Sequence, residues 1–402
     1  MIPDKEFFDW IEAHIADDPK ALRLKYSRKN PGFDVGFAIL QIECRRKYAS
    51  KLAGTLAAFR NFIFPTSLSG EQSTSDLLAE YHCSLTDNTG TVADLTAGLG
   101  IDATHFAAAG CDVTAVERIP ELAEALKYNA RGLNCDSLSV FTGDCREFIS
   151  DAVSSGKFID TCFIDPARRS ADGGRVYALS DCEPDIARLI PDISKICRRL
   201  IIKMSPMLDI SHTARELPRS PVSIISLGTP KECKELLAVI DFGAEDNTVP
   251  VIEATTLSGN KTTTLSFTAT QERDAIPQTG GLPSAGDYIY EPFPAVIKSG
   301  AHRLLSERFG VMMFHSNTHL YHSSQLSDNF PGEAHRIISL MPYASKHIKR
   351  FKRDYPRISV CTRNFGISAE ALKTKLGVAD GGTLRVYGFT DAGGGRYLAV
   401  TE

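Results

Sequence analysis

Features that would place a chain in a membrane or outside the cell are missing from this sequence of 402 residues. No run of about 18 apolar residues occurs, so we expect no membrane-spanning segment. The N-terminus, Met1 to Glu6, lacks the basic-then-apolar layout of a secretory signal. The ten cysteines form no C-x-x-C pair and no cysteine–histidine cluster at zinc spacing. We therefore expect a cytoplasmic protein with reduced thiols and no bound metal.

A strong net charge is also absent. The formal charge is −4, which argues against nucleic-acid binding over the whole surface. The charge is unevenly placed, however, because residues 288–402 contain 15 Lys and Arg against 9 Asp and Glu. Lys349, Arg350 and Arg353 belong to a basic run spaced by three and four residues, so on a helix several would share one face. Such a stripe is typical of a phosphate-binding face, and equally of a solvated helix face.

Hydrophobic periodicity changes along the chain. Residues 1–85 have helical patterning, whereas residues 86–268 alternate short β-rich runs with helix-length segments. This alternation predicts right-handed βαβ crossovers and a mostly parallel sheet. The expected strands are 91–95, 112–117, 138–142, 159–165, 200–204, 222–227 and 235–242. The last two are separated too briefly for a crossover helix, so we expect an antiparallel hairpin that closes the sheet.

The segment 269–287 contains Pro277-Gln278-Thr279-Gly280-Gly281-Leu282-Pro283 and predicts a linker. Beyond it, residues 288–402 predict a separate α+β module. Its β-rich stretches, 311–314 and 384–389, flank helical segments such as 369–376.

The strongest local signal is the stretch Asp94-Leu95-Thr96-Ala97-Gly98-Leu99-Gly100-Ile101-Asp102, between an expected strand and an expected helix. Glycines at this corner let the backbone approach a ligand closely, and the helix N-terminus presents unpaired N–H groups. Glu117 ends the next expected strand, where a carboxylate can accept hydrogen bonds from both ribose hydroxyls of an adenosine. So far the pattern fits a dinucleotide site equally well, because Gly98-x-Gly100-x-x-Ala103 satisfies the relaxed fingerprint.

Two further acidic residues follow the third and fourth expected strands. Asp144 follows the third strand, where a carboxylate can accept the exocyclic amine of adenine. Asp165-Pro166 follows the fourth, at the central crevice where ligands of α/β sheets bind. A methyltransferase uses acidic residues at the ends of all four strands, and a dehydrogenase does not need them together. Helix capping is the alternative explanation for any one of them, above all for Asp144.

With these motifs, residues 86–245 resemble the class I S-adenosylmethionine-dependent methyltransferases. Asp94–Gly100 is similar to their motif I, and Asp165-Pro166 occupies the place of motif IV. The resemblance implies an α/β fold with a Rossmann-like, seven-stranded sheet, and S-adenosyl-L-methionine as the cofactor. The cofactor-binding residues that it implies are Asp94, Thr96, Ala97, Gly98, Gly100, Asp102, Glu117, Arg118, Asp144, Cys145 and Asp165.

The chain also resembles RNA-modifying members of this superfamily. The spelling from Thr96 to Ala103 is similar to that of bacterial small-subunit rRNA guanine methyltransferases. The layout with its tail looks like the bacterial methyltransferases that end in a THUMP-like domain, which implies that 288–402 is a ferredoxin-like or THUMP-like RNA-binding module. The implied activity is methylation of a nucleobase of rRNA or tRNA, with RNA as the partner. The alternatives are an NAD-dependent oxidoreductase and a catalytically idle RNA-binding protein.

Asp165 and Pro166 are the candidate catalytic residues. Methyl transfer is a direct displacement, so the enzyme mainly aligns the acceptor, and a carboxylate or carbonyl here can accept the N–H of a base amine. Ala167-Arg168 departs from the second proline and the aromatic residue that are usual in amine methylases. The loop after Pro166 contains three arginines, Arg168, Arg169 and Arg175, which are the candidate RNA contacts of this loop. Arginine side chains suit phosphate oxygens, because the guanidinium can donate two hydrogen bonds at once. A solvated surface loop is the alternative interpretation.

Two other segments carry weaker signals. Gly70–Asp76 is similar in position to the segment that closes over the methionine end of the cofactor in related enzymes, and a Ser/Thr-rich helix cap explains it equally. His315, His319 and His322 have no nearby carboxylate or cysteine to complete a metal site, so we expect them at the surface or facing RNA.

Overall fold

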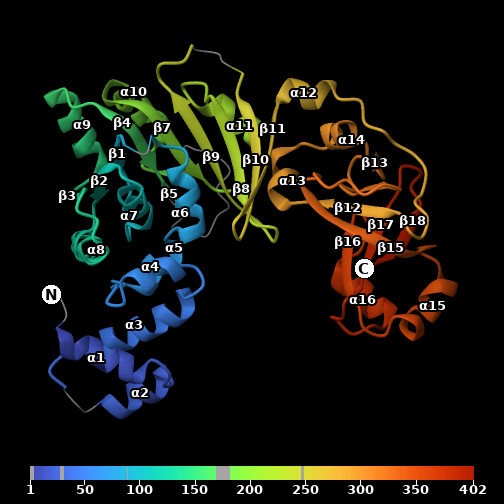
Figure 1. The fold of residues 1–402 in the computed structure, drawn as a ribbon, viewed down its shortest axis with the longest axis horizontal. Helices are drawn as coiled ribbons and strands as arrows, with labels where there is room; N and C mark the ends of the chain where they lie inside the picture. The colour runs from blue at the N-terminus through green and yellow to red at the C-terminus, as the bar shows by residue number, and fades with distance from the viewer. Residues whose placement is uncertain (1–3, 28–30, 88, 169–181, 246–248) are drawn as a thin grey trace. The chain divides into compact units, whose positions relative to one another are not determined.

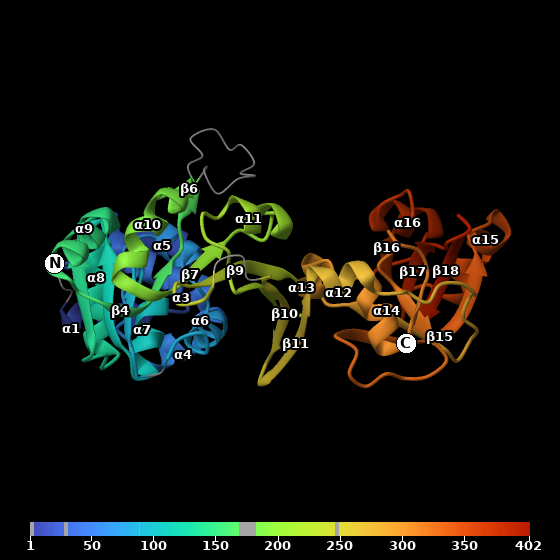
Figure 2. The ribbon, with the colours of Figure 1, turned by 90° about the horizontal axis from the view of Figure 1, so that it is seen from above.

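The computed structural model describes residues 4–27, 31–87, 89–168, 182–245 and 249–402 (Figures 1 and 2). The chain forms two compact units. The first contains Met1–Met204, Ser211–Val222 and Ala238–Thr248. The second contains Ser205–Ile210, Ser223–Leu237 and Val249–Glu402. This division differs from the predicted domain boundaries, because the helical segment 1–85 belongs to the same unit as the strands that follow it.

Among the described residues, six helices precede the first strand, in agreement with the helical pattern of the sequence. They are α1 (Lys5–His14), α2 (Pro19–Tyr26), α3 (Val35–Tyr48), α4 (Ala53–Ala58), α5 (Ser67–Gln72) and α6 (Asp76–Cys83). The first three begin after Asp4, Asp18 and Asp34, whose carboxylates accept backbone N–H groups of the first turn. Their apolar faces enclose a core of buried side chains that includes Phe7 and Ile39.

Buried contacts join this helical segment to the rest of its unit. The amide of Asn129, which is 1% exposed, accepts a hydrogen bond from the backbone N–H of Ile63 at 2.8 Å and donates one to the carbonyl of Ile63 at 2.9 Å. At Gly132, a Cβ would lie 2.2 Å from the ring of Phe59, so the close packing there requires glycine. The helical segment therefore packs on the α/β part as one core.

The sheet of the α/β part contains all seven strands that the sequence predicted. They are β1 (Thr91–Asp94), β2 (Asp112–Glu117), β3 (Leu138–Thr142), β4 (Ile159–Ile164), β7 (Cys197–Met204), β8 (Ser223–Gly228) and β9 (Cys233–Asp241). Their order is β3-β2-β1-β4-β7-β9-β8, and the pairs from β3 to β7 are parallel. Parallel strands are covered by helices on both faces, which explains their nearly continuous apolar runs.

The predicted hairpin is present, but it does not close the sheet. β8 and β9 are neighbours joined by a short turn, in which the N–H of Thr229 donates to the carbonyl of Glu232 at 2.9 Å. The sheet continues beyond β8 through β10 (Val251–Ser258), which is parallel to β8, and β11 (Lys261–Thr268), which is antiparallel to β10. The described sheet therefore has nine strands, seven of which form the expected core.

Helices connect the strands of this sheet (Figure 1). They are α7 (Ile101–Ala108), α8 (Pro120–Gly132), α9 (Cys145–Ser155), α10 (Ile186–Ile196) and α11 (Ile210–Glu216). The connection after β4 also contains the short paired strands β5 (Ala167–Arg168) and β6 (Cys182–Glu183). Since consecutive parallel strands all end at one edge of the sheet, the loops after β1, β2, β3 and β4 lie along that edge.

The C-terminal unit contains a second sheet, with the order β13-β14-β12-β15-β18-β17-β16. Its strands are β12 (Tyr288–Pro292), β13 (Met312–Met313), β14 (Tyr321–Ser323), β15 (Gly332–Pro342), β16 (Ser359–Arg363), β17 (Arg385–Thr390) and β18 (Arg396–Thr401). Its helices are α13 (Pro294–Ser299), α14 (Arg303–Phe309), α15 (Ser345–Asp354) and α16 (Ala369–Leu376). The α+β character predicted for this module is confirmed.

The segment predicted as a linker is partly ordered against this module. It begins with helix α12 (Ala269–Asp274). The carboxylate of Glu272 accepts hydrogen bonds from the backbone N–H groups of His302, Arg303 and Leu304, at 2.8 to 3.1 Å. Glu272 therefore caps the N-terminus of α14, where an acidic group is favoured.

None of the described helices is long and apolar enough to cross a membrane. In the part of the chain that the structure describes, no group of three or more His, Cys, Asp or Glu side chains is placed to hold a metal ion.

Candidate active site

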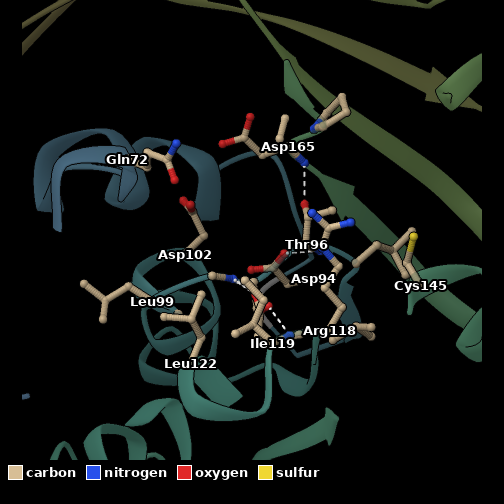
Figure 3. A pocket seen from close by; sticks show the side chains of 18 of the residues that line it. Gln72, Asp94, Thr96, Leu99, Asp102, Arg118, Ile119, Leu122, Cys145 and Asp165 are labelled. Atoms are coloured by element: carbon tan, nitrogen blue, oxygen red, sulfur yellow. Dashed lines mark hydrogen bonds between the residues drawn. The ribbon is translucent and has the colours of Figure 1, made fainter. Parts of the chain in front are cut away.

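A pocket of about 760 Å³ lies at the edge of the sheet where β1, β2 and β4 end (Figure 3). All of the residues predicted to bind the cofactor line it. These are Asp94, Thr96, Ala97, Gly98, Gly100, Asp102, Glu117, Arg118, Asp144, Cys145 and Asp165. In Figure 3, Gln72, Asp102 and Asp165 lie on one side of the pocket, and Ile119 and Leu122 lie on the opposite side. The structure thus brings the predicted residues together around one cavity.

The glycine corner between β1 and α7 has the geometry that its sequence predicts. Gly98 and Gly100 have φ angles of 56° and 82°, in the left-handed region that favours glycine. A Cβ at Gly100 would lie 2.6 Å from the side chain of Leu126, so this position also needs glycine for packing. A Cβ at Gly98 would meet no atom within 4 Å. Gly98 therefore exposes its backbone to the pocket, whereas Gly100 packs inward.

Glu117, at the end of β2, is held in place by the backbone. Its carboxylate accepts hydrogen bonds from the N–H of Gly98 at 2.8 Å and from the N–H of Ile119 at 2.7 Å. The side chain is buried, yet it lines the pocket. Each carboxylate oxygen can accept more than one hydrogen bond, so Glu117 keeps acceptor capacity for a ligand hydroxyl.

Asp94, at the end of β1, is 2% exposed and accepts a hydrogen bond from the N–H of Thr96 at 3.2 Å. Burial raises the pKa of this carboxyl well above its ordinary value, and the neighbouring charges of Asp102 and Asp165 raise it further. The hydrogen bond from Thr96 and the positive charge of Lys203 act in the opposite direction. A positively charged ligand in the pocket would therefore favour ionisation of Asp94.

Asp102, in the first turn of α7, is buried and fully engaged by side chains. Its carboxylate lies 2.7 Å from Nδ1 of His82 and accepts a hydrogen bond from the hydroxyl of Thr74 at 2.5 Å. Burial alone would raise its pKa, but the charge and hydrogen bond of His82, together with Lys203 and Thr74, lower it to about 2. Asp102 is therefore ionised at neutral pH, and it lines the pocket.

Asp165 follows β4, at the place where the sequence predicts that the methyl-accepting group of the substrate binds. Its backbone N–H donates to the hydroxyl of Thr96 at 2.7 Å (Figure 3). Its carboxylate lies 2.6 Å from Nζ of Lys203. Pro166 also lines the pocket. The sequence analysis did not identify Lys203. The sequence did contain a signal for this residue, because Lys203 lies near the end of the expected strand 200–204. The structure places that strand, β7, beside β4, where Ile202 pairs with Ile164.

Asp144 has the helix-capping role that was the alternative explanation for it. Its carboxylate accepts a hydrogen bond from the backbone N–H of Arg146 at 2.9 Å and is bound by the Arg146 guanidinium at 2.8 and 2.9 Å. These hydrogen bonds lower the pKa of Asp144 to about 2. Arg146 also contacts Glu183 at 2.9 Å, which joins the start of α9 to β6. Contact of Asp144 with an adenine amine stays a prediction.

The Ser/Thr-rich segment before α6 does reach the pocket. Ser69, Gln72, Ser73 and Thr74 line it. Of the predicted RNA-contacting arginines in the loop after Asp165, Arg169 and Arg175 lie outside the described residues. The backbone of Arg168 belongs to β5.

The basic residues of the tail lie on helix α15, as their spacing predicts. The exposed members are Lys346, Lys349, Arg350, Lys352 and Arg353. Phe351 is buried and packs the opposite side of the helix into the module. The expectation that the tail histidines are at the surface is wrong for His322, which is 5% exposed and contacts the ring of Phe314 at 4.6 Å between centroids. Its position on a short strand inside the second sheet explains its burial.

The strand order, the glycine corner and the pocket at the carboxyl ends define a Rossmann-like α/β protein of the methyltransferase type. Two family models match the C-terminal part of the chain. Residues 288–331 match a ferredoxin-like domain, and residues 332–402 match a THUMP domain-like model. No curated protein matches the sequence.

One of the solved structures compared is similar over the whole chain. A protein of Porphyromonas gingivalis W83, described as a candidate methyltransferase, is 28% identical, with a TM-score of 0.88 over 100% of this chain and 99% of that one. An RNA methyltransferase from Salinibacter ruber, solved with S-adenosyl-L-homocysteine, is 13% identical over 42% of this chain and 91% of its own, with a TM-score of 0.29. The chain therefore has a methyltransferase fold like that of the Porphyromonas gingivalis protein, with ferredoxin-like and THUMP-like domains in its C-terminal part.

Proposed function

We propose that this protein is an S-adenosylmethionine-dependent methyltransferase that modifies a nucleobase of rRNA or tRNA. The observation that carries the proposal is the set of acidic side chains around one pocket at the ends of adjacent parallel strands. Asp94 follows from β1, Glu117 from β2 and Asp165 from the loop after β4. The similarity to the Porphyromonas gingivalis protein supports the same reaction class.

The residues present suit this cofactor. Glu117 is oriented by two backbone N–H groups and can accept hydrogen bonds from ribose hydroxyls. Gly98 leaves open space for close approach of the ligand to the backbone. Ile119 and Leu122 supply apolar surface on which an adenine ring can pack. The carboxylates of Asp102 and Asp165 face the pocket, where they favour a ligand that carries positive charge.

S-adenosylmethionine supplies an electrophilic methyl group. The protein has to exclude water and hold the acceptor atom in line. Asp165 suits the second task, because its backbone is tied to Thr96 and its carboxylate to Lys203. From that fixed position the carboxylate can accept the N–H of a base amine, with the Pro166 carbonyl as a second acceptor.

RNA as the substrate rests on the C-terminal unit. The THUMP domain-like match and the exposed basic face of α15 support it. The loop arginines Arg168, Arg169 and Arg175 are proposed as further RNA contacts. The described cysteines are all free thiols, which supports a reducing cytoplasm as the site of action.

Calorimetry tests the cofactor directly. S-adenosylmethionine or its demethylated product should bind. Glu117→Ala should weaken binding by about 1–3 kcal/mol, because the polar groups that the buried carboxylate bonds would be left without a hydrogen-bond partner. Glu121→Ala, an exposed carboxylate in the first turn of α8, is the matched control and should leave the affinity unchanged. Tight binding of NAD with no binding of the sulfonium cofactor would make the protein an oxidoreductase.

The substrate is then identified by mass spectrometry of rRNA and tRNA nucleosides from a deletion strain. One methylated nucleoside should disappear and should return with the wild-type gene but not with Asp165→Asn. Complete nucleoside profiles in the deletion strain would contradict an RNA substrate.

A further inference from the structure

A chain of polar side chains runs from the pocket into the interior of the same unit. The carboxylate of Asp165 lies 2.6 Å from Nζ of Lys203, and Nζ of Lys203 donates to the hydroxyl of Thr74 at 3.2 Å. The Thr74 hydroxyl donates to Asp102, which contacts His82. Lys203 thus links Asp165 to Asp102 through the hydroxyl of Thr74.

Lys203 itself is well shielded. Its side chain is 13% exposed, and it does not line the pocket, unlike Asp94, Asp102 and Asp165. Its charge nevertheless acts on all three carboxyls. It forms the ion pair with Asp165, it adds to the effect of His82 that lowers the pKa of Asp102, and it opposes the rise in the pKa of Asp94 that burial causes. A shielded cation thus stands behind three acidic groups that face a ligand.

In a methyltransferase, the charge of the pocket affects the relative affinities for the cofactor and for its product. Its cofactor and its product have nearly the same shape, but the sulfonium of the cofactor carries a positive charge that the thioether of the product lacks. Carboxylates around the pocket favour the charged form, and a nearby cation reduces that preference. The balance between the two therefore determines how readily the product is displaced by fresh cofactor.

We propose that Lys203 is a positioning residue that sets the preference of the pocket for the sulfonium cofactor over its thioether product, by offsetting the charges of Asp102 and Asp165. This inference rests on the proposed function, since it needs that cofactor. Lys203 also fixes the carboxylate of Asp165 at the acceptor position through the same ion pair.

The test compares the affinities of S-adenosylmethionine and S-adenosylhomocysteine, measured by calorimetry at one pH and ionic strength. In Lys203→Met the ratio of the two affinities should rise in favour of the sulfonium by roughly tenfold, as expected when one nearby charge is removed at an intermediate effective dielectric constant. Lys203→Arg keeps the positive charge and should keep the wild-type ratio. Lys195→Met removes an exposed lysine from α10 and should also leave the ratio unchanged.

The ratio separates charge from structure. If Lys203 were only structural, Lys203→Met would weaken both ligands equally, and an unchanged ratio would overturn the inference. A ratio that moves toward the thioether would overturn it as well. If neither ligand binds to the wild-type protein, the proposed function fails, which is a different result from an unchanged ratio. Far-ultraviolet circular dichroism of each variant confirms that the compared proteins are folded.

Discussion

The hydroxyl of Thr96 accepts a hydrogen bond from the backbone N–H of Asp165 at 2.7 Å. The two residues are far apart in the sequence, one in the glycine corner after β1 and the other in the loop after β4. The contact therefore fixes the position of the acceptor-side loop relative to the loop that would hold the cofactor. Carboxyl ends of adjacent parallel strands make such a contact possible, because β1 and β4 are neighbours in the sheet.

Thr96→Val should destabilise the protein by about 1 kcal/mol, because it removes the only acceptor oxygen of this side chain and leaves a backbone N–H unpaired. Thr96→Ser keeps the hydroxyl and should retain most of the stability. The measurement is urea-induced unfolding of both variants. If Thr96→Val unfolds at the same urea concentration as the wild type, the contact contributes nothing to stability.

Asp165→Asn should abolish methyl transfer while leaving the affinity for S-adenosylmethionine within a few-fold. The reason is that the carboxylate would act on the acceptor, so its loss is felt chiefly in the transition state. Single-turnover methylation of RNA from the deletion strain, together with calorimetry, measures the two effects. Full methylation by Asp165→Asn would remove the carboxylate from the mechanism.

Asp102 should contribute to acid sensitivity. Its pKa is lowered to about 2 in the folded protein, so its ionised form stabilises the fold above the unfolded pKa near 4. This contribution, of about 2 kcal/mol, should be lost as the pH falls from about 4 through about 2. Asp144, whose pKa is also lowered to about 2, acts in the same window.

The contributions of Asp102 and Asp144 can be separated by comparing the wild type with Asp102→Asn. The measurement is the free energy of unfolding of both proteins between about pH 5 and about pH 2. The variant should lose part of the pH dependence, while Asp144 supplies the rest. Curves of equal slope for the two proteins would show that Asp102 is not ionised in the folded state.

The basic face of α15 should contact RNA phosphates. Replacing Lys349, Arg350 and Arg353 together with glutamine should reduce the slope of log affinity against log salt by about two units, if each residue meets one phosphate. Cofactor affinity should not change, because the pocket lies in the other unit. Filter binding of total tRNA and rRNA at several salt concentrations gives the slope.

Glutamine at Lys231, Lys234 and Lys261, which are also exposed, is the control for a general loss of positive charge. The control variant should retain most of the wild-type slope. An unchanged slope in the α15 variant would assign this face to solvation of the module.

Sequence reasoning succeeded where the physical signal is local. The periodicity of apolar residues predicted the strands of the parallel core, and glycine spacing predicted the left-handed corner at Gly98 and Gly100. It missed the β10–β11 extension, because a threonine-rich hairpin at a sheet edge has no apolar run to mark it. It also assigned a linker to residues that Glu272 fastens to helix α14.

The sequence by itself determined which residues turn at the glycine corner and which acids end the strands, because backbone sterics and alternating burial act within a few residues. Only the tertiary structure decided which of these acids face a cation or a histidine. Lys203 meets Asp165, and His82 meets Asp102, through sheet order and helix packing that join distant segments. The charge of the pocket follows from those long-range contacts, since a carboxylate's pKa depends on the groups that surround it in space.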